Sequence, residues 1–200
     1  MTEKKRCVWC NPANPRYIEY HDREWGQLRT DDPYLFEMLL LESFQAGLSW
    51  ECILNKRENF RRAFDGFDPK KICAYDEAKK EELLADPGIV RNRLKVNAAV
   101  GNAKIFLQLA EEYGSFRNYL NTFVQDRVLI EQHQVTNELS DAISADLKKR
   151  GMKFVGSTII YAYLQAIGMI NSHEPDCFLY PGKMKEKKTI TPVISGHGMV

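Results

Sequence analysis

The chain has 200 residues, enough for one domain with a substantial apolar core or for two small helical lobes that pack together. Its 28 lysines and arginines nearly balance 27 aspartates and glutamates, which gives a net charge of +1. The overall charge therefore cannot attract a nucleic acid, and binding to one would need a local basic patch. Five cysteines, and a start without the pattern of a secretory signal, predict a reduced, cytoplasmic protein. No apolar run approaches the roughly 20 residues of a membrane span, so we expect no membrane partner.

Capping signals and periodicity predict helices along most of the chain. Asp32 and Pro33 form a start signal, and residues 34–48 are apolar on nearly every side, as in a buried helix. Further helices are predicted over residues 49–64, from Asp68 and Pro69 onward, and over 74–86, 91–114, 115–124, 140–151 and 157–170, the last three with a serine at or near the N-cap. No segment alternates as a strand would, so the expected fold class is all-α, followed by a flexible tail over residues 184–200.

Glu42 is a charged residue inside the helix that is predicted to be buried. Its neighbours on that helix include Met38, Leu39, Leu41 and Phe44. A buried carboxylate without a partner is costly and has a raised pKa, so a charge kept in such a place has either a structural or a functional partner. From the residues alone both explanations stay open.

Five aromatic residues, including all three tryptophans, lie in the first quarter of the chain. They are Trp9, Tyr17, Tyr20, Trp25 and Trp50. Such a set forms either part of a core or a stacking pocket for a planar ligand, and a core is the commoner outcome.

A tight turn between helices is predicted in LADPGIVRNRLK, residues 84–95. Gly88 permits a turn whose backbone N–H groups point at a phosphate, with Arg91 and Lys95 as nearby cations. A plain connection between two helices would have a similar sequence.

Cys7 and Cys10 stand at C-x-x-C spacing near the start of the chain. Two thiolates at this spacing suit half of a zinc site or a reducible disulfide, and chance also explains them. A dithiol redox protein usually carries the motif beside a βαβ unit, and this helical pattern lacks one.

Four blocks of sequence stand in a recognisable order: YIEYHDREWG (17–26), LFEMLLLESFQAGLSW (35–50), DPGIVRNRLK (86–95) and KKRGMKFVGSTIIYAYLQAIGMINSH (148–173). Together they resemble the 3-methyladenine DNA glycosylase I family of the helix-hairpin-helix superfamily, roughly over residues 6–182. The chain departs from the family pattern at Asn121, usually Trp, at Phe44, frequently a polar residue, and over residues 124–139. The resemblance implies one unit over residues 1–183, with a helix-hairpin-helix lobe (about 31–125) and a zinc-bearing lobe (about 1–30 with 138–183).

The resemblance also implies one structural Zn²⁺ per chain, held by Cys7, His21, His173 and Cys177. Two thiolates and two imidazoles make a closed tetrahedral set with no open position for a catalytic water. Cys10 is then a bystander.

The activity implied is base-excision repair: hydrolysis of the N-glycosidic bond of 3-methyladenine in alkylated double-stranded DNA by base flipping, without a lyase step, by a monomer that releases free 3-methyladenine. By family position Glu42 is the catalytic or base-binding carboxylate. The other base-binding residues implied are Tyr20, Trp50, Trp9, Tyr17 and Trp25. The DNA-binding residues implied are Gly47, Leu48, Gly88, Ile89, Val90, Arg91 and Lys95.

A zinc-stapled module that binds damaged DNA or a methylated base without cleaving it is the alternative. Such a module would keep the zinc and hairpin residues, and it would have less need of Glu42.

Overall fold

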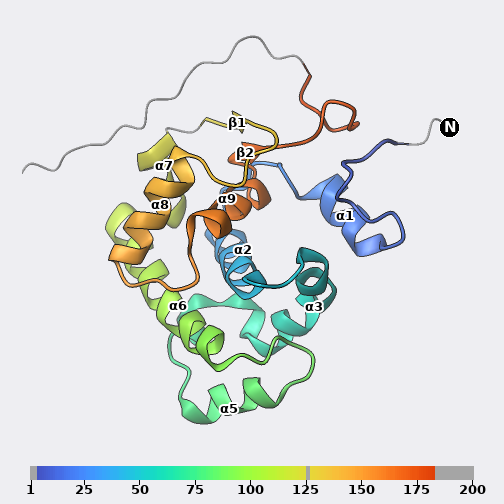
Figure 1. The fold of residues 1–200 in the computed structure, drawn as a ribbon. Coiled ribbons are helices and arrows are strands. Elements are labelled where there is room, and N and C mark those ends of the chain that lie inside the picture. Colours follow the sequence, from blue (N-terminus) through green and yellow to red (C-terminus); the bar gives the residue numbers. More distant parts are fainter. Residues whose placement is uncertain (1–3, 125–126, 183–200) are drawn as a thin grey trace, which may run out of the picture.

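A computed structural model describes residues 4–124 and 127–182, and these residues are almost entirely helical (Figure 1). In chain order the helices are α1 (Pro15–Arg23), α2 (Asp32–Gln45), α3 (Trp50–Ala63), α4 (Pro69–Ile72), α5 (Glu77–Ala85), α6 (Arg93–Tyr113), α7 (Phe116–Val124), α8 (Glu138–Lys149) and α9 (Ser157–Ala166), with a 3₁₀ turn η1 (Asp65–Phe67) after α3. The all-α prediction is confirmed over these ranges, whereas the tail predicted for residues 184–200 lies outside them. The division of residues 1–183 into two lobes stays a prediction.

Helix starts follow the expected capping chemistry, with shifts at three helices. Asp31, one residue before the predicted cap, caps α2 and accepts a hydrogen bond from the N–H of Tyr34. Helix α8 begins earlier than predicted because Asn137 and Ser140 form a reciprocal capping box, so the serine lies inside the first turn. Gly156 is the N-cap of α9, and Ser157, predicted at or near the cap, is the first residue of the helix.

Two short parallel strands correct the prediction that the chain has none. β1 (Leu129–Ile130) pairs with β2 (Ile170–Asn171), with Leu129 opposite Ile170. Two residues are too few to show an alternating pattern, so periodicity gave no signal. The pairing places the loop after β1 beside the loop after β2.

Helix α2 lies at the centre of the molecule (Figure 1) and contacts α3, α6, α7 and α9. All ten residues from Leu35 to Phe44 are buried, which confirms the prediction of a helix covered on every side. Phe44 packs against Phe60 with ring centroids 4.9 Å apart, so this departure from the family pattern lies in the core. Across the described ranges, no helix has the length and apolar character needed to cross a membrane.

Candidate functional site

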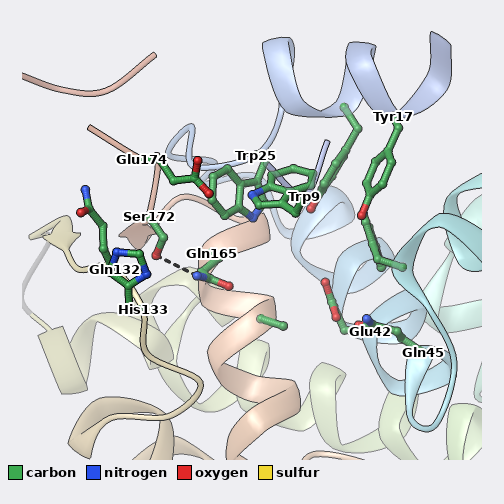
Figure 2. A pocket seen from close by; sticks show the side chains of 13 residues that line it. Trp9, Tyr17, Trp25, Glu42, Gln45, Gln132, His133, Gln165, Ser172 and Glu174 are labelled. Atoms are coloured by element: carbon green, nitrogen blue, oxygen red, sulfur yellow. Dashed lines mark hydrogen bonds between the residues drawn. The ribbon is translucent and has the colours of Figure 1, made fainter. Parts of the chain in front are cut away.

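A cleft of about 280 Å³ lies between α1, the end of α2, the start of α3 and one face of α9 (Figure 2). The loops after β1 and β2 close its far side. Its lining residues are Trp9, Tyr17, Tyr20, Trp25, Glu42, Gln45, Trp50, Gln132, His133, Ala162, Gln165, Ser172 and Glu174. All six residues predicted to bind a base therefore line one cavity.

Glu42 reaches this cleft from the buried helix α2. Its side chain is only 3% exposed, and within the described structure its Oε2 has no hydrogen-bond partner. Burial raises the pKa of Glu42 to about 8, and no cation in the described part of the chain offsets this effect. A structural carboxylate would have its oxygens satisfied, so the geometry favours a partner that enters the cleft.

The aromatic residues belong partly to the core and partly to the cleft wall. Tyr20 and Trp25 are buried, whereas Trp9, Tyr17 and Trp50 are half-buried against the core. Trp9 meets Trp25 edge to face at a centroid distance of 4.7 Å, and Tyr20 lies 5.2 Å from Trp50. The buried Nε1 of Trp50 is a second polar atom without a partner among the described residues. The wall thus offers apolar faces and unused polar atoms to a planar ligand.

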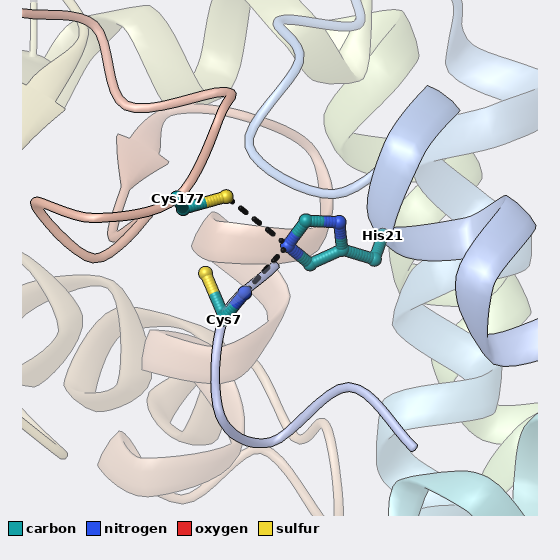
Figure 3. A group of neighbouring side chains, drawn as sticks. All are labelled: Cys7, His21 and Cys177. Atoms are coloured by element: carbon teal, nitrogen blue, oxygen red, sulfur yellow. Dashed lines mark hydrogen bonds between the residues drawn. The ribbon is translucent and has the colours of Figure 1, made fainter. Parts of the chain in front are cut away.

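A second buried set of polar side chains joins the two ends of the described chain. The Sγ atoms of Cys7 and Cys177 and one ring nitrogen of His21 all lie within 4.8 Å of one another (Figure 3). His173 packs edge to face on His21 with centroids 5.1 Å apart, and its buried Nε2 has no hydrogen-bond partner in the part of the chain described. We call these four residues the Cys–His cluster. Cys10 is not among the three grouped donors, and its Sγ faces the carbonyl oxygen of Tyr17 at 3.7 Å.

Partners outside the Cys–His cluster orient its donor atoms. Nδ1 of His21 lies 2.8 Å from Asp22 Oδ1, which leaves Nε2 facing the sulfurs. Backbone N–H groups of Glu174 and Leu179 point at the sulfurs of Cys7 and Cys177, at 3.4 and 3.5 Å. Such second partners are typical of residues that coordinate a metal.

The protonation of the Cys–His cluster also suits a cation. Burial lowers the pKa of His21 and lowers that of His173 to about 4, so both imidazoles are neutral at pH 7. Burial raises the pKa of Cys7 to about 12, and a bound cation reverses this by stabilising the thiolate. The donors of Cys7, His21 and Cys177 therefore fit a soft divalent metal, and His173 as the fourth ligand stays a prediction.

The predicted hairpin connects α5 to α6, and α3 holds it in place. Lys56 Nζ donates to the carbonyl oxygens of Pro87 and Gly88, at 3.0 and 3.3 Å, and Asn59 also donates to Gly88 O. A side chain at position 88 would meet Asp86 and Asn59 at 2.8–3.1 Å, so close packing is the reason for glycine here. These contacts turn carbonyl oxygens toward α3. The N–H of Gly88 donates to Asp86 Oδ1 at 2.7 Å, which corrects the prediction that it faces a phosphate.

Other hairpin residues divide between the core and the surface. Ile89 is 3% exposed and packs in the core, so it contributes only backbone groups to any surface. Val90 is half-buried and Arg91 is exposed.

Lys95 corrects the prediction that its ammonium faces a phosphate. Its side chain is buried, and Nζ donates to the carbonyl oxygens of Phe44 and Ala46 at 2.8 and 2.6 Å. These carbonyls end α2, where a helix has acceptors without helical partners and attracts a cation. The lysine caps the helix that carries Glu42.

The turn that follows α2 is exposed, as its predicted role requires. Gly47 has φ +80°, a conformation that favours glycine, and added side-chain atoms would meet open space. Leu48 is 41% exposed at the tip of this turn, and Trp50 begins α3 directly after it.

Several cleft residues were not predicted from the sequence. They are Gln45, Gln132, His133, Ala162, Gln165, Ser172 and Glu174. The pairing of β1 with β2 brings the loops that contain residues 132, 133, 172 and 174 to the cleft, and no local pattern shows that pairing. Ala162 and Gln165 of α9 lie in the motif block of residues 148–173, so their place in that block could have indicated a role in the site.

Comparison with known proteins agrees with this arrangement. A family model described as methyladenine glycosylase matches residues 9–180. DNA-3-methyladenine glycosylase 1 of Escherichia coli (strain K12) is 45% identical over 184 residues, which cover 89% of this chain and 98% of that protein. A crystal structure of 3-methyladenine DNA glycosylase I matches with a TM-score of 0.85 at 44% identity, covering 88% of this chain and 100% of the other.

A further solved structure carries a ligand. It is a Tyr-to-Phe variant of 3-methyladenine DNA glycosylase I in complex with 3-methyladenine, and it matches with a TM-score of 0.83 at 34% identity over 91% of this chain and 99% of that one. These findings confirm the resemblance carried by the four motif blocks. The chain belongs to the methyladenine glycosylase family.

Proposed function

We propose that the protein is a DNA-3-methyladenine glycosylase that acts on alkylated double-stranded DNA and releases free 3-methyladenine without a lyase step. The observation that carries the proposal is the buried Glu42 in an aromatic cleft, whose Oε2 has no partner among the described residues. The relatives named above support it.

The lesion itself supplies much of the driving force. A methyl group on N3 makes the base of the nucleotide cationic and weakens its glycosidic bond. The base leaves with the bonding electrons and becomes neutral, so the positive charge passes to the sugar as an oxocarbenium-like centre. Water oxygen bonds to C1′ and its proton goes to solvent, which balances the hydrolysis and calls for no covalent step on the protein.

Glu42 distinguishes the cationic lesion from neutral adenine. A positive charge in the cleft favours the ionised carboxylate and opposes the effect of burial on its pKa. The ionised carboxylate then attracts the cationic base through its charge, and the faces of residues such as Trp50 also attract a cation. Tyr20, Trp9, Tyr17 and Trp25 complete the wall.

The base must leave the duplex to reach this cleft. Flipping costs less for a lesion that pairs badly. The Gly47–Leu48 turn fills the gap in the stack, and the exposure of Leu48 supports this role. The hairpin contacts the DNA backbone through the N–H group of Val90, with Arg91 beside a phosphate, because the N–H groups of Gly88 and Ile89 already donate to Asp86.

The Cys–His cluster holds one zinc ion in this proposal. When bound, the metal supplies a structural link between the first and the last part of the unit. The chain's own contribution is the set of oriented donors. Four protein ligands would leave no open position for a water, so the metal would take no part in the hydrolysis.

The test is product analysis. Methylated duplex DNA is incubated with the protein, and released bases are separated by chromatography. Time-dependent release of 3-methyladenine, lost in Glu42→Gln, supports the proposal. Binding of the methylated duplex without release of a base would instead make the chain a non-catalytic binder of damaged DNA.

A further inference from the structure

The cleft wall that α9 provides has no role in the mechanism above. Ala162 and Gln165 lie on one face of α9, three residues apart, and both line the cleft. The backbone is fixed there, since the N–H of Gly26 donates to the carbonyl oxygen of Gln165 at 2.9 Å. The small alanine leaves room beside the glutamine side chain.

A chain of hydrogen bonds runs from Gln165 to a carboxylate. Gln165 Nε2 donates to Ser172 Oγ at 2.7 Å. The Ser172 hydroxyl also faces the phenol of Tyr161, a contact that acts to lower the pKa of Tyr161. The Tyr161 hydroxyl in turn donates to Glu131 Oε2 at 3.3 Å. Asn137 also donates to this oxygen, at 2.8 Å.

The Glu131 carboxylate determines which group donates and which accepts at each step of this series of hydrogen bonds. An ionised carboxylate only accepts hydrogen bonds, so Tyr161 must use its proton on Glu131. Ser172 must then donate to the Tyr161 oxygen, and its own oxygen is left to accept from the amide of Gln165. The amide therefore turns its NH₂ group toward Ser172 and its Oε1 into the cleft, as Figure 2 shows.

We infer that Gln165 is a specificity-determining residue whose Oε1 accepts a hydrogen bond from the exocyclic amino group of the flipped base. The inference rests on the proposed function. It makes the preferred substrates 6-aminopurines and disfavours 6-oxopurines methylated at the same position. An oxo group would bring two acceptors together, which costs more than the loss of one hydrogen bond.

Gln165 and Glu42 thus respond to different properties of one base. Glu42 responds to positive charge, whereas Gln165 responds to the donor or acceptor character of the purine edge. A base can satisfy one and fail the other, so the two contributions are separable by experiment.

The experiment compares two free bases of similar shape, 3-methyladenine and 3-methylhypoxanthine, by calorimetric titration. We expect wild type to prefer 3-methyladenine by about 10- to 100-fold. Gln165→Leu should bring the two affinities within about threefold, chiefly by weakening 3-methyladenine binding. Gln108→Leu, at an exposed position of α6, is the matched control and should keep the preference.

A second variant separates specificity from a merely structural role. Ser172→Ala removes the acceptor for the amide NH₂ group, so the Gln165 amide is free to turn. We expect Ser172→Ala to bind 3-methylhypoxanthine more tightly than wild type does, by about three- to tenfold, a gain that local loosening does not produce.

An unchanged preference in Gln165→Leu, or no gain in Ser172→Ala, would overturn the inference while base release from methylated DNA still supports the proposed function. Failure of wild type to bind 3-methyladenine or release it would instead remove the proposed function itself.

Discussion

The Cys–His cluster and the cleft are both buried sets of polar side chains, but they treat their polar atoms differently. In the cluster, Asp22 orients His21 and backbone N–H groups point at both sulfurs, while the predicted donor atom His173 Nε2 has no partner among the described residues. In the cleft, Glu42 Oε2 and Trp50 Nε1 have no partner among the described residues. The cluster has the supporting contacts expected around a permanently bound metal. The cleft instead keeps a donor and an acceptor available for a base that binds transiently.

This difference has an energetic consequence. An unsatisfied buried polar group costs roughly 1–3 kcal/mol, so the cleft lowers the stability of the fold when it is empty. The cluster, once it binds a metal, should raise stability. Changes in the two regions are therefore expected to have opposite effects on unfolding.

The largest expected effect is loss of the metal. Cys7→Ser should abolish binding of the single zinc ion expected per chain and lower the melting temperature sharply, because structural zinc contributes on the order of 10 kcal/mol to folding. A chelator should lower the melting temperature of wild type in the same way. Metal analysis and thermal unfolding measure both results.

Cys10→Ser is the matched control for this prediction. Its sulfur faces the Tyr17 carbonyl outside the cluster, so zinc content should stay at wild-type level. Equal loss of zinc from both variants would contradict the ligand assignment, and full zinc content in Cys7→Ser would remove Cys7 from it.

The second effect concerns Glu42→Gln, which should lower the rate of 3-methyladenine release by at least about tenfold. Burial raises the folded-state pKa of Glu42 from 4.5 to about 8, so the folded chain holds a proton that the unfolded chain releases between these values. Wild type therefore loses stability as pH rises from 4.5 to 8, by roughly 3–5 kcal/mol, and Glu42→Gln lacks this loss. Urea unfolding at pH 5 and pH 8.5 measures the difference.

Glu111→Gln, at an exposed position of α6, is the control and should keep the wild-type slope of stability against pH. If Glu42→Gln shows the wild-type slope together with undiminished base release, the carboxylate is not the open group of the cleft.

The two regions also differ in how much of them the sequence predicts. The apolar neighbours of Glu42 predict its burial correctly, because the helix period determines which residues surround it. They do not predict that its Oε2 lacks a partner, since that depends on elements far away in sequence. The Cys–His cluster brings together residues 7, 21, 173 and 177, a separation that no spacing rule covers, and only the family resemblance implied it.

Lys95 is a case in which neighbours in sequence led to a wrong prediction. Its position just after the hairpin favoured a phosphate contact, but its partners, the carbonyl oxygens of Phe44 and Ala46, lie about fifty residues earlier. Sequence neighbours therefore predicted the wrong environment for this ammonium group.

The third prediction concerns the buried ammonium group of Lys95, which donates to carbonyl oxygens of the protein. Lys95→Met keeps the length of the side chain and leaves the carbonyls of Phe44 and Ala46 without this donor, so the free energy of unfolding should fall by about 1–3 kcal/mol. Release from duplex DNA should fall severalfold because the Gly47–Leu48 turn begins at these carbonyls. Free 3-methyladenine should bind with nearly wild-type affinity.

Lys104→Met, at an exposed position of α6, should change neither property. Wild-type stability in Lys95→Met, measured by urea unfolding, would contradict the capping role. An equal loss of free-base and duplex affinity would show that the lysine supports the cleft rather than the turn.

The smallest expected effect lies outside both buried regions. Arg91 is exposed beside the hairpin, and Arg93, two residues later, is already paired with Glu81 at 2.5 and 3.0 Å. Arg91→Ala should weaken binding to DNA of any sequence a fewfold and reduce the slope of log K against log salt by about 1, because one fewer counterion is released. Arg93→Ala, the matched control, should change the slope less, because its charge is already offset by Glu81. Binding measured across a salt series, with free-base affinity alongside, distinguishes the two; identical slopes for wild type and Arg91→Ala would place Arg91 outside the DNA interface.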